Sequence, residues 1–219
     1  MSREIKIFIV YLISFSILCG LVLFAPNDVP TGFRMFFLVV VFIISTPLLI
    51  KYANIYSWRF LFGFSLLVSI FQVLPDWFLS QVLGVLIFPD DGFPKIGTVS
   101  AYMAGLWTIP LFISVVSAQY VHEKLGGNLH IITGFIALAI FWISEETMHM
   151  IPVWIAKDVE LIGSAAIYVL PAEFMLGVFF SYILQQAKFA KFTSRVVLAF
   201  SVSIFYTGAL SFFYLMIQG

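Results

Sequence analysis

The chain has 219 residues, of which 62% are hydrophobic and only 10% are charged. With a mean hydropathy of +1.09, this composition excludes a soluble globular protein and predicts one all-α integral membrane domain over residues 1–219. The 11 basic and 11 acidic residues cancel, which excludes nucleic acid as a partner and leaves the lipid bilayer and a lipophilic small molecule as the expected partners.

Seven apolar segments are long enough to cross a membrane as helices, since a crossing takes about 20 residues. The first is expected to be retained, because it is longer than the apolar core of a signal peptide and no cleavage site follows it. The third contains Pro75 and Asp76, so it is either one kinked helix or a crossing followed by a shorter amphipathic segment. The segments are about 6–24, 33–51, 58–87, 99–121, 130–151, 161–186 and 194–217.

The basic residues predict the orientation of these segments. With the N-terminus inside, most of them fall on the inner side, as the positive-inside rule requires. We therefore expect a seven-helix bundle with the N-terminus inside and the C-terminus outside, in the cell membrane and in bacteria the inner membrane. The inner residues are Arg3, Lys6, Lys51, Arg59, Lys124, Lys188, Lys191 and Arg195, and the outer ones are Arg34, Lys95 and Lys157.

The connections are short, and the most informative one is PDDGFPKIG at residues 89–97. Its two prolines and two glycines exclude a helix and predict a structured turn. We find no internal sequence repeat, which argues against the inverted-repeat architecture of many transporters. The single cysteine, Cys19, excludes an internal disulfide and any multi-cysteine metal or redox site. The sequence favours no particular oligomeric state.

Ionisable residues within the apolar segments are the candidates for function. Such a group is costly inside a membrane unless it is paired or faces water. In the orientation above, five of them fall in the outer half of the membrane, where we expect them to share one chamber. These candidate catalytic residues are Asp76, Glu145, Glu146, His149 and Glu173.

The spacing on the fifth segment places either glutamate beside the imidazole. Glu145 and His149 are four residues apart, and Glu146 and His149 are three apart. The two glutamates are about 100° apart on a helix, so only one is expected to point fully into the bundle, and we favour Glu146. Several carboxyl groups in a low-dielectric chamber cannot all ionise cheaply, so at least one is expected to carry a proton. The alternative interpretation is a structural hydrogen-bond network between helices.

A metal site is the other chemistry that these residues suggest. Glu146-x-x-His149 matches half of a carboxylate-bridged di-metal motif, but the other half is missing, because His122 and His130 flank the opposite loop. We expect no metal and no cofactor. The alternative is a single metal ion held by Asp76, Glu146, His149 and Glu173.

Aromatic residues make up 18% of the chain, and most are expected to pack against lipid or at the membrane interface. Three tryptophans lie close to the acids along the sequence, and an indole face beside an acid suits a cationic intermediate. The acidic pair in the 89–97 loop is placed to cap the chamber from above. The candidate substrate-binding residues are Trp77, Trp107, Trp142, Asp90 and Asp91.

The segment LPAEFMLGVFF at residues 170–180 resembles the Pro-x-Glu-Glu segment of small integral-membrane lycopene cyclases, with Glu173 at the first Glu and Phe174 in place of the second. Seven crossings with intramembrane carboxylates also resemble the transmembrane terpene cyclases. The resemblance implies an acid that protonates an isoprenoid alkene or epoxide. The stretches PDDGFP, LWTIPLF, EETMHMIPVW and YVLPAEF resemble an uncharacterised family of small bacterial multi-pass membrane proteins.

Two classes of function remain. A retinal-binding opsin is excluded, because residues 196–219 contain no lysine to form a Schiff base. The first class is an acid–base cyclase or isomerase that acts on a lipophilic substrate. The second is a non-enzymatic protein, either a proton-coupled carrier or an assembly factor, that uses the same acids as a proton path or as helix contacts. The sixth segment has no ionisable residue between Glu173 and Lys188, which favours the enzyme.

Overall fold

The computed structural model describes residues 2–24, 28–148, 150–151 and 153–219. Within these residues, seven helices are long and apolar enough to cross a membrane, as the sequence predicts. They are α1 (Arg3–Phe24), α2 (Thr31–Ala53), the joined α3 (Ser57–Phe71), α4 (Val73–Trp77) and η1 (Phe78–Val82), the joined α5 (Met103–Leu106) and α6 (Thr108–Leu125), α7 (Leu129–Met148), α8 (Val169–Lys188) and α9 (Phe192–Gln218).

The third crossing is one helix of 26 residues, from Ser57 to Val82. Of the two predicted forms, the structure therefore has the single long helix. Its last turn is a π-helix, and the chain leaves it through Gly84, whose φ of 68° is a conformation that glycine adopts without strain. The extra residue in a π-turn changes which side chains face the bundle beyond Asp76.

Short strands occupy the positions where two helices were predicted to start. The fourth crossing starts at Met103 rather than residue 99, and the sixth at Val169 rather than residue 161, because the preceding residues form hairpins. The hairpins pair β2 (Lys95–Ile96) with β3 (Val99–Ser100), and β5 (Leu161–Ile162) with β6 (Ala165–Ala166). A further antiparallel pair joins β1 (Leu86–Ile87) to β4 (Ile155–Ala156).

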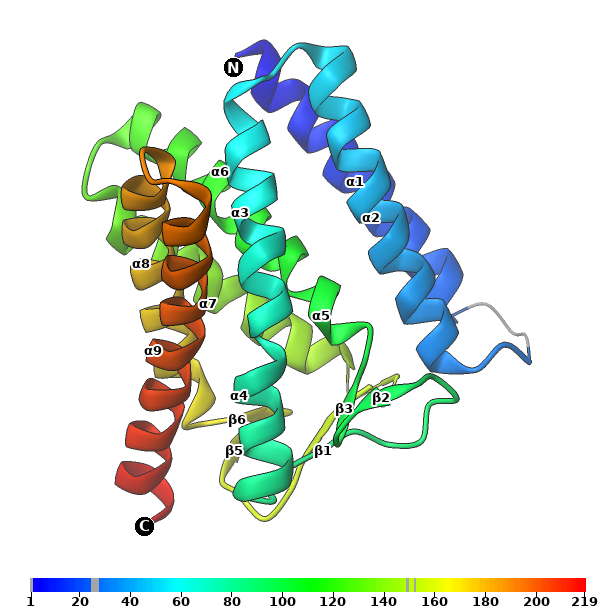
Figure 1. The fold of residues 1–219 in the computed structure, drawn as a ribbon. Coiled ribbons are helices and arrows are strands. Elements are labelled where there is room, and N and C mark those ends of the chain that lie inside the picture. Colours follow the sequence, from blue (N-terminus) through cyan, green and yellow to red (C-terminus); the bar gives the residue numbers. More distant parts are fainter. Residues whose placement is uncertain (1, 25–27, 149, 152) are drawn as a thin grey trace.

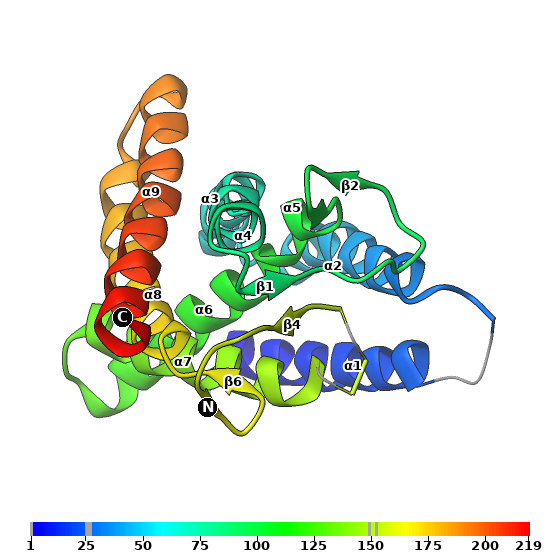
Figure 2. The same ribbon diagram turned by 90° about the horizontal axis from the view of Figure 1, so that it is seen from below.

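The helices of the bundle form three sets. Helices α7, α8 and α9 pack closely on one another, α3 and α6 lie between them and the rest, and α1 packs chiefly on α2. Figure 1 shows the α1–α2 pair leaning away from α7–α9, with the two termini at opposite ends. All the strands lie at the end where α9 finishes, and Figure 2 shows β1 and β4 side by side across that end.

The two hairpins are copies of one motif, which corrects the expectation of no internal repeat. Residues 96–102 read IGTVSAY and residues 162–168 read IGSAAIY, so the offset is 66 residues. Gly97 and Gly163 both have φ of 63°. Each hairpin follows a crossing helix that ends near the strands and one short strand. The next crossing helix begins directly after the hairpin. The repeats run in the same direction and so are not inverted.

Equivalent hydrogen bonds close the two hairpins. Ala101 N donates to Pro94 O at 2.9 Å, and Ile167 N donates to Glu160 O at 3.0 Å. The β1–β4 pair is the seam between the two repeats. Hydrogen bonds within the two equivalent hairpins, and between β1 and β4, therefore hold the strand end of the bundle together.

The glycines at the hairpin turns give a first prediction. Gly163→Ala should lower the melting temperature more than Gly97→Ala does. Both substitutions place an L-residue in the left-handed region, at about 1–2 kcal/mol each. The new Cβ at Gly163 would also collide with the Glu146 carboxyl group, whereas at Gly97 it would lie 3.1 Å from Cδ1 of the half-exposed Trp77.

Thermal unfolding of the purified protein in detergent measures this difference. Gly208→Ala is the control, because a Cβ there has no neighbour within 4 Å. Equal melting temperatures for Gly163→Ala and Gly97→Ala would contradict the tight fit around Gly163.

Candidate active site

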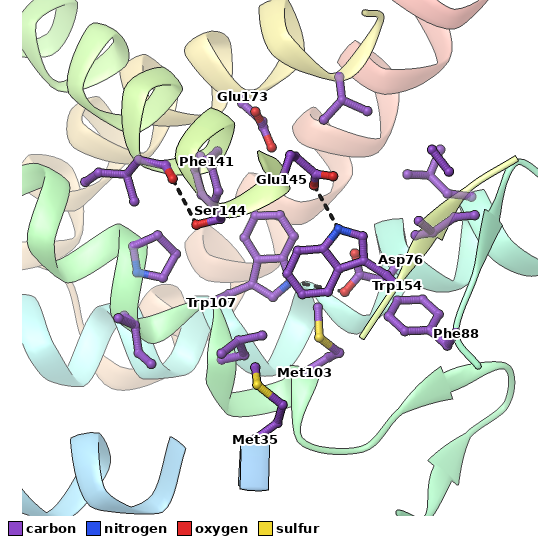
Figure 3. A pocket seen from close by; sticks show the side chains of 18 of the residues that line it. Met35, Asp76, Phe88, Met103, Trp107, Phe141, Ser144, Glu145, Trp154 and Glu173 are labelled. Atoms are coloured by element: carbon purple, nitrogen blue, oxygen red, sulfur yellow. Dashed lines mark hydrogen bonds between the residues drawn. The ribbon is translucent and has the colours of Figure 1, made fainter. Parts of the chain in front are cut away.

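A cavity of about 270 Å³ lies between the α1–α2 pair and the rest of the bundle, near the strand end. Its wall is mostly apolar, and its polar groups gather on one side, as the close view shows (Figure 3). Among the described residues, three carboxyl side chains reach it from three separate helices: Asp76 from α4, Glu145 from α7 and Glu173 from α8. The structure thus brings together three of the five side chains predicted as catalytic.

Indole groups hold two of the three acids. Trp107 Nε1 donates to Asp76 Oδ2 at 3.0 Å, and Trp154 Nε1 donates to Glu145 Oε1 at 2.9 Å (Figure 3). Asp76 is 4% exposed. A hydrogen bond to a carboxylate offsets part of the cost of burying it, so each indole both fixes an acid and stabilises its charge.

Glu173 has no such partner. It is 2% exposed, and its side chain accepts no hydrogen bond within the described part of the chain; Oε2 is fully shielded from solvent. Glu145 is close enough to act on it electrostatically, as it also does on Asp76. A buried polar group without a partner costs on the order of 1–3 kcal/mol. Such groups in native proteins call for a ligand, a water molecule or a catalytic role.

Two tyrosines complete the polar side of the cavity. Tyr206 of α9 is buried, acts electrostatically on all three acids, and packs edge-on against Trp107 with ring centroids 5.6 Å apart. Tyr168 lies at the start of α8 and is also buried. The acids are therefore surrounded by aromatic rings.

The structure corrects the preference for Glu146 over Glu145. Glu145 lines the cavity, whereas Glu146 Oε1 accepts hydrogen bonds from Ser164 N at 3.0 Å and from Trp142 Nε1 at 3.3 Å. The β5–β6 hairpin supplies the backbone donor, and Gly163 leaves room for the carboxylate. Glu146 anchors the hairpin to α7 and does not face the cavity.

Several predicted substrate-binding residues lie outside the cavity wall. Trp77 and Trp142 are 38% and 39% exposed, and Asp90 is exposed on its loop. His149 lies outside the described residues. Of the predicted aromatic residues, only Trp107 lines the cavity.

Asp91 is buried in its own loop instead of capping the chamber. Oδ2 accepts hydrogen bonds from Ser100 Oγ at 2.9 Å and Tyr102 Oη at 2.6 Å, and Oδ1 accepts one from Phe93 N at 3.0 Å. Burial, and then the hydrogen bond to Asp91, raises the pKa of Tyr102 above its ordinary value, so the phenol remains a donor. The backbone of Asp91 also accepts from Gly32 N at the start of α2. Asp91 therefore joins the first hairpin to α2.

Trp154, Tyr168 and Tyr206 were missed as site residues. Trp154 stands in a connection whose fold depends on the strands, so no helical spacing pointed to it. Tyr168 falls inside the predicted sixth segment, but in the structure it lies just before α8. Tyr206 did carry a signal, since it is a side chain with a polar tip in the middle of an apolar helix.

Among the described residues, no group of three or more His, Cys, Asp or Glu side chains is placed to hold a metal ion. The alternative of a single metal required Glu146 and His149. Glu146 points to the hairpin, and His149 is not among the residues that the structure describes.

Comparisons with known proteins add a family. The model described as "Domain of unknown function (DUF6989)" matches residues 73–217. All three cavity acids, and the two indoles that donate to Asp76 and Glu145, fall inside this range. Neither a curated protein nor a solved structure matches the chain.

The loop acids give a second prediction. Asp91→Asn should lower the free energy of unfolding by about 1–3 kcal/mol, because an amide NH₂ replaces one acceptor and faces donors. Asp90→Asn, on the exposed neighbour, should change it by less than about 0.5 kcal/mol. Denaturation of both purified variants in detergent measures the difference. Equal stability would show that the Asp91 hydrogen bonds do not hold the loop.

Proposed function

The chain belongs to the family of the domain of unknown function DUF6989, and we propose that it is a membrane-embedded acid–base enzyme that isomerises or cyclises a lipophilic, isoprenoid-type substrate. The observation that carries this proposal is the unpartnered Glu173 beside Glu145 in an apolar cavity. The protein would lie in the cell membrane, in bacteria the inner one, with its N-terminus inside and the strand end outside. The distribution of basic residues supports this orientation.

The three acids have different surroundings, and these suggest different roles. A buried carboxyl group without a donor is more stable in its neutral form, so Glu173 is the proton donor. Asp76 and Glu145 are buried as well, but each accepts an indole N–H, which makes their ionisation less costly than that of Glu173. Pairs of acids whose surroundings differ in this way provide the acid and the base of a proton-transfer reaction.

The reaction balances without any further reactant. Glu173 gives its proton to one carbon of an alkene, so that its O–H bond breaks, a C–H bond forms and a neighbouring carbon becomes cationic. The rings of Trp107 and Tyr206 and the carboxylates stabilise this cation. A second double bond can attack it to close a ring. Loss of a proton to Glu145 or Asp76 then forms the new double bond, and its return to Glu173 restores the site.

Comparative lipid analysis of a strain that lacks the gene, complemented with wild type or variants, tests the proposal. Glu173→Gln should lower the product by at least about 100-fold, the usual contribution of general acid–base catalysis, and so should whichever of Glu145→Gln and Asp76→Asn removes the base. Chromatographic retention must be compared as well as mass, because isomerisation and cyclisation leave the mass unchanged.

The matched control is Glu146→Gln, since its amide oxygen can still accept from Ser164 N. It should leave the product near the wild-type level. Identical lipid profiles for the empty strain and the wild-type strain would reject the enzyme. A full product level in folded Glu173→Gln would reject the role of this acid.

One observation favours the alternative of a proton-coupled carrier. Ser65, Ser69, Gln72 and Asp76 form a buried polar row along α3 and α4, which rises about 16 Å from Ser65 to Asp76. Neither polar atom of the Gln72 side chain has a partner within the residues described. The row gives Asp76 polar neighbours toward the inner end of the bundle.

Proton flux into liposomes with an internal pH dye separates the two functions. For the enzyme, we expect no flux above that of empty liposomes. A flux that Gln72→Leu and Asp76→Asn abolish would establish the carrier instead. Ser201→Ala is the control for this assay, because the Ser201 hydroxyl donates to Leu198 O in its own helix.

A further inference from the structure

The described wall of the cavity combines three carboxyl groups with no basic side chain and no side-chain amide. Its other polar groups are indoles, phenols, the Cys19 thiol and Ser144, whose hydroxyl donates to Ile140 O in its own helix. A phosphate or carboxylate on a ligand would therefore meet the carboxylates of Asp76 and Glu145 and no cationic partner. Like charges at close range in a low-dielectric site are strongly unfavourable.

A positively charged ligand head would be favoured beside the cavity acids. Glu173 is buried, placed on the cavity wall and without a hydrogen-bond partner among the described residues. An amine nitrogen can take up its proton, so that the O–H bond breaks, an N–H bond forms and the new ammonium N–H bonds to the Glu173 carboxylate. A charge-assisted hydrogen bond to a carboxylate is about twice as strong as a neutral one. Trp107, Trp154 and Tyr206 line the same side, and aromatic faces attract cations, most strongly when water is excluded.

The far side of the cavity suits a hydrocarbon tail. It is formed by side chains of α1 and α2: Phe15, Cys19, Leu23, Met35 and Leu38. A ligand with a charged head and an alkyl tail could therefore place its head among the acids and its tail along these two helices (Figure 3 shows Met35 on the side away from Glu173).

We propose that the cavity binds a lipophile whose head carries one positive charge, such as a long-chain tertiary amine, and rejects lipophiles with a phosphate or carboxylate head. This inference rests on the proposed function for the cationic intermediate that the amine resembles, whereas the location of the site rests on the cavity itself. It narrows the substrate to a neutral or cationic lipid.

Three probes with an unbranched ten-carbon chain and different heads test the inference: n-decyldimethylamine, n-decanol and sodium decanoate, whose ten carbons include the carboxylate carbon. Each is titrated calorimetrically into the full-length protein in nanodiscs of zwitterionic lipid, with empty nanodiscs as the blank for partitioning. The amine should bind at least about tenfold more tightly than the alcohol, and decanoate should not bind above the blank. This comparison uses the wild-type protein and does not depend on any variant folding.

Glu173→Gln identifies the group responsible. It should remove most of the preference for the amine over the alcohol, whereas Glu123→Gln, an exposed carboxyl group on α6 outside the cavity wall, should preserve it. Equal affinity for amine and alcohol, measurable binding of decanoate, or a preference that survives in folded Glu173→Gln would each overturn the inference.

The two proposals can fail separately. Selective amine binding without any lipid product in the complemented strain would retain the cation site and reject the enzyme. A product that depends on Glu173, together with no preference for the amine, would retain the enzyme and reject the cation site.

Discussion

The burial of three carboxyl groups in an apolar bundle is the constraint on which the structure of the site depends. Water is largely excluded, so the protein must supply the donors that water would have provided. Trp107 and Trp154 do so for Asp76 and Glu145. Trp154 stands next to β4, and β4 is held by its pairing with β1. The strands at this end of the bundle therefore position a donor, and Glu173 is the acid that receives none from the residues that the structure describes.

The internal repeat explains why neighbouring acids have different roles. At an offset of 66 residues, the Ser80–Thr98 hydrogen bond of the first unit corresponds to the Glu146–Ser164 hydrogen bond of the second. Glu146 thus occupies the position of Ser80 in the second unit, and both residues join a helix to the hairpin that follows it. By the same offset Trp107 corresponds to Glu173. One unit supplies an indole donor where the other supplies an unpartnered acid, so the site depends on the difference between two otherwise similar units.

Hydropathy was sufficient to predict the seven helices, because crossing length and apolar content are local properties of the sequence. The choice between Glu145 and Glu146 was not local: both positions suited an inward-facing side chain, and a backbone donor 18 residues away decided it. Trp154 reached the site through strand pairing, which no periodicity reports. The hairpins did have a local signal, the repeated Ile-Gly-x-x-x-x-Tyr at residues 96 and 162, which a comparison of the chain with itself could have found.

The family match covers one part of the cavity wall and leaves the other part outside. Residues 73–217 contain the acids, the indoles and both tyrosines, whereas the apolar wall formed by α1 and α2 lies before this range. Helix α1 packs chiefly on α2 and contributes to the cavity only through apolar side chains and Cys19. The groups able to move protons thus lie in the matched part, and the surface that would contact a hydrocarbon tail lies outside it. Substitutions in α1 or α2 can therefore change the shape of the tail site without disturbing the hydrogen bonds that hold Asp76 and Glu145.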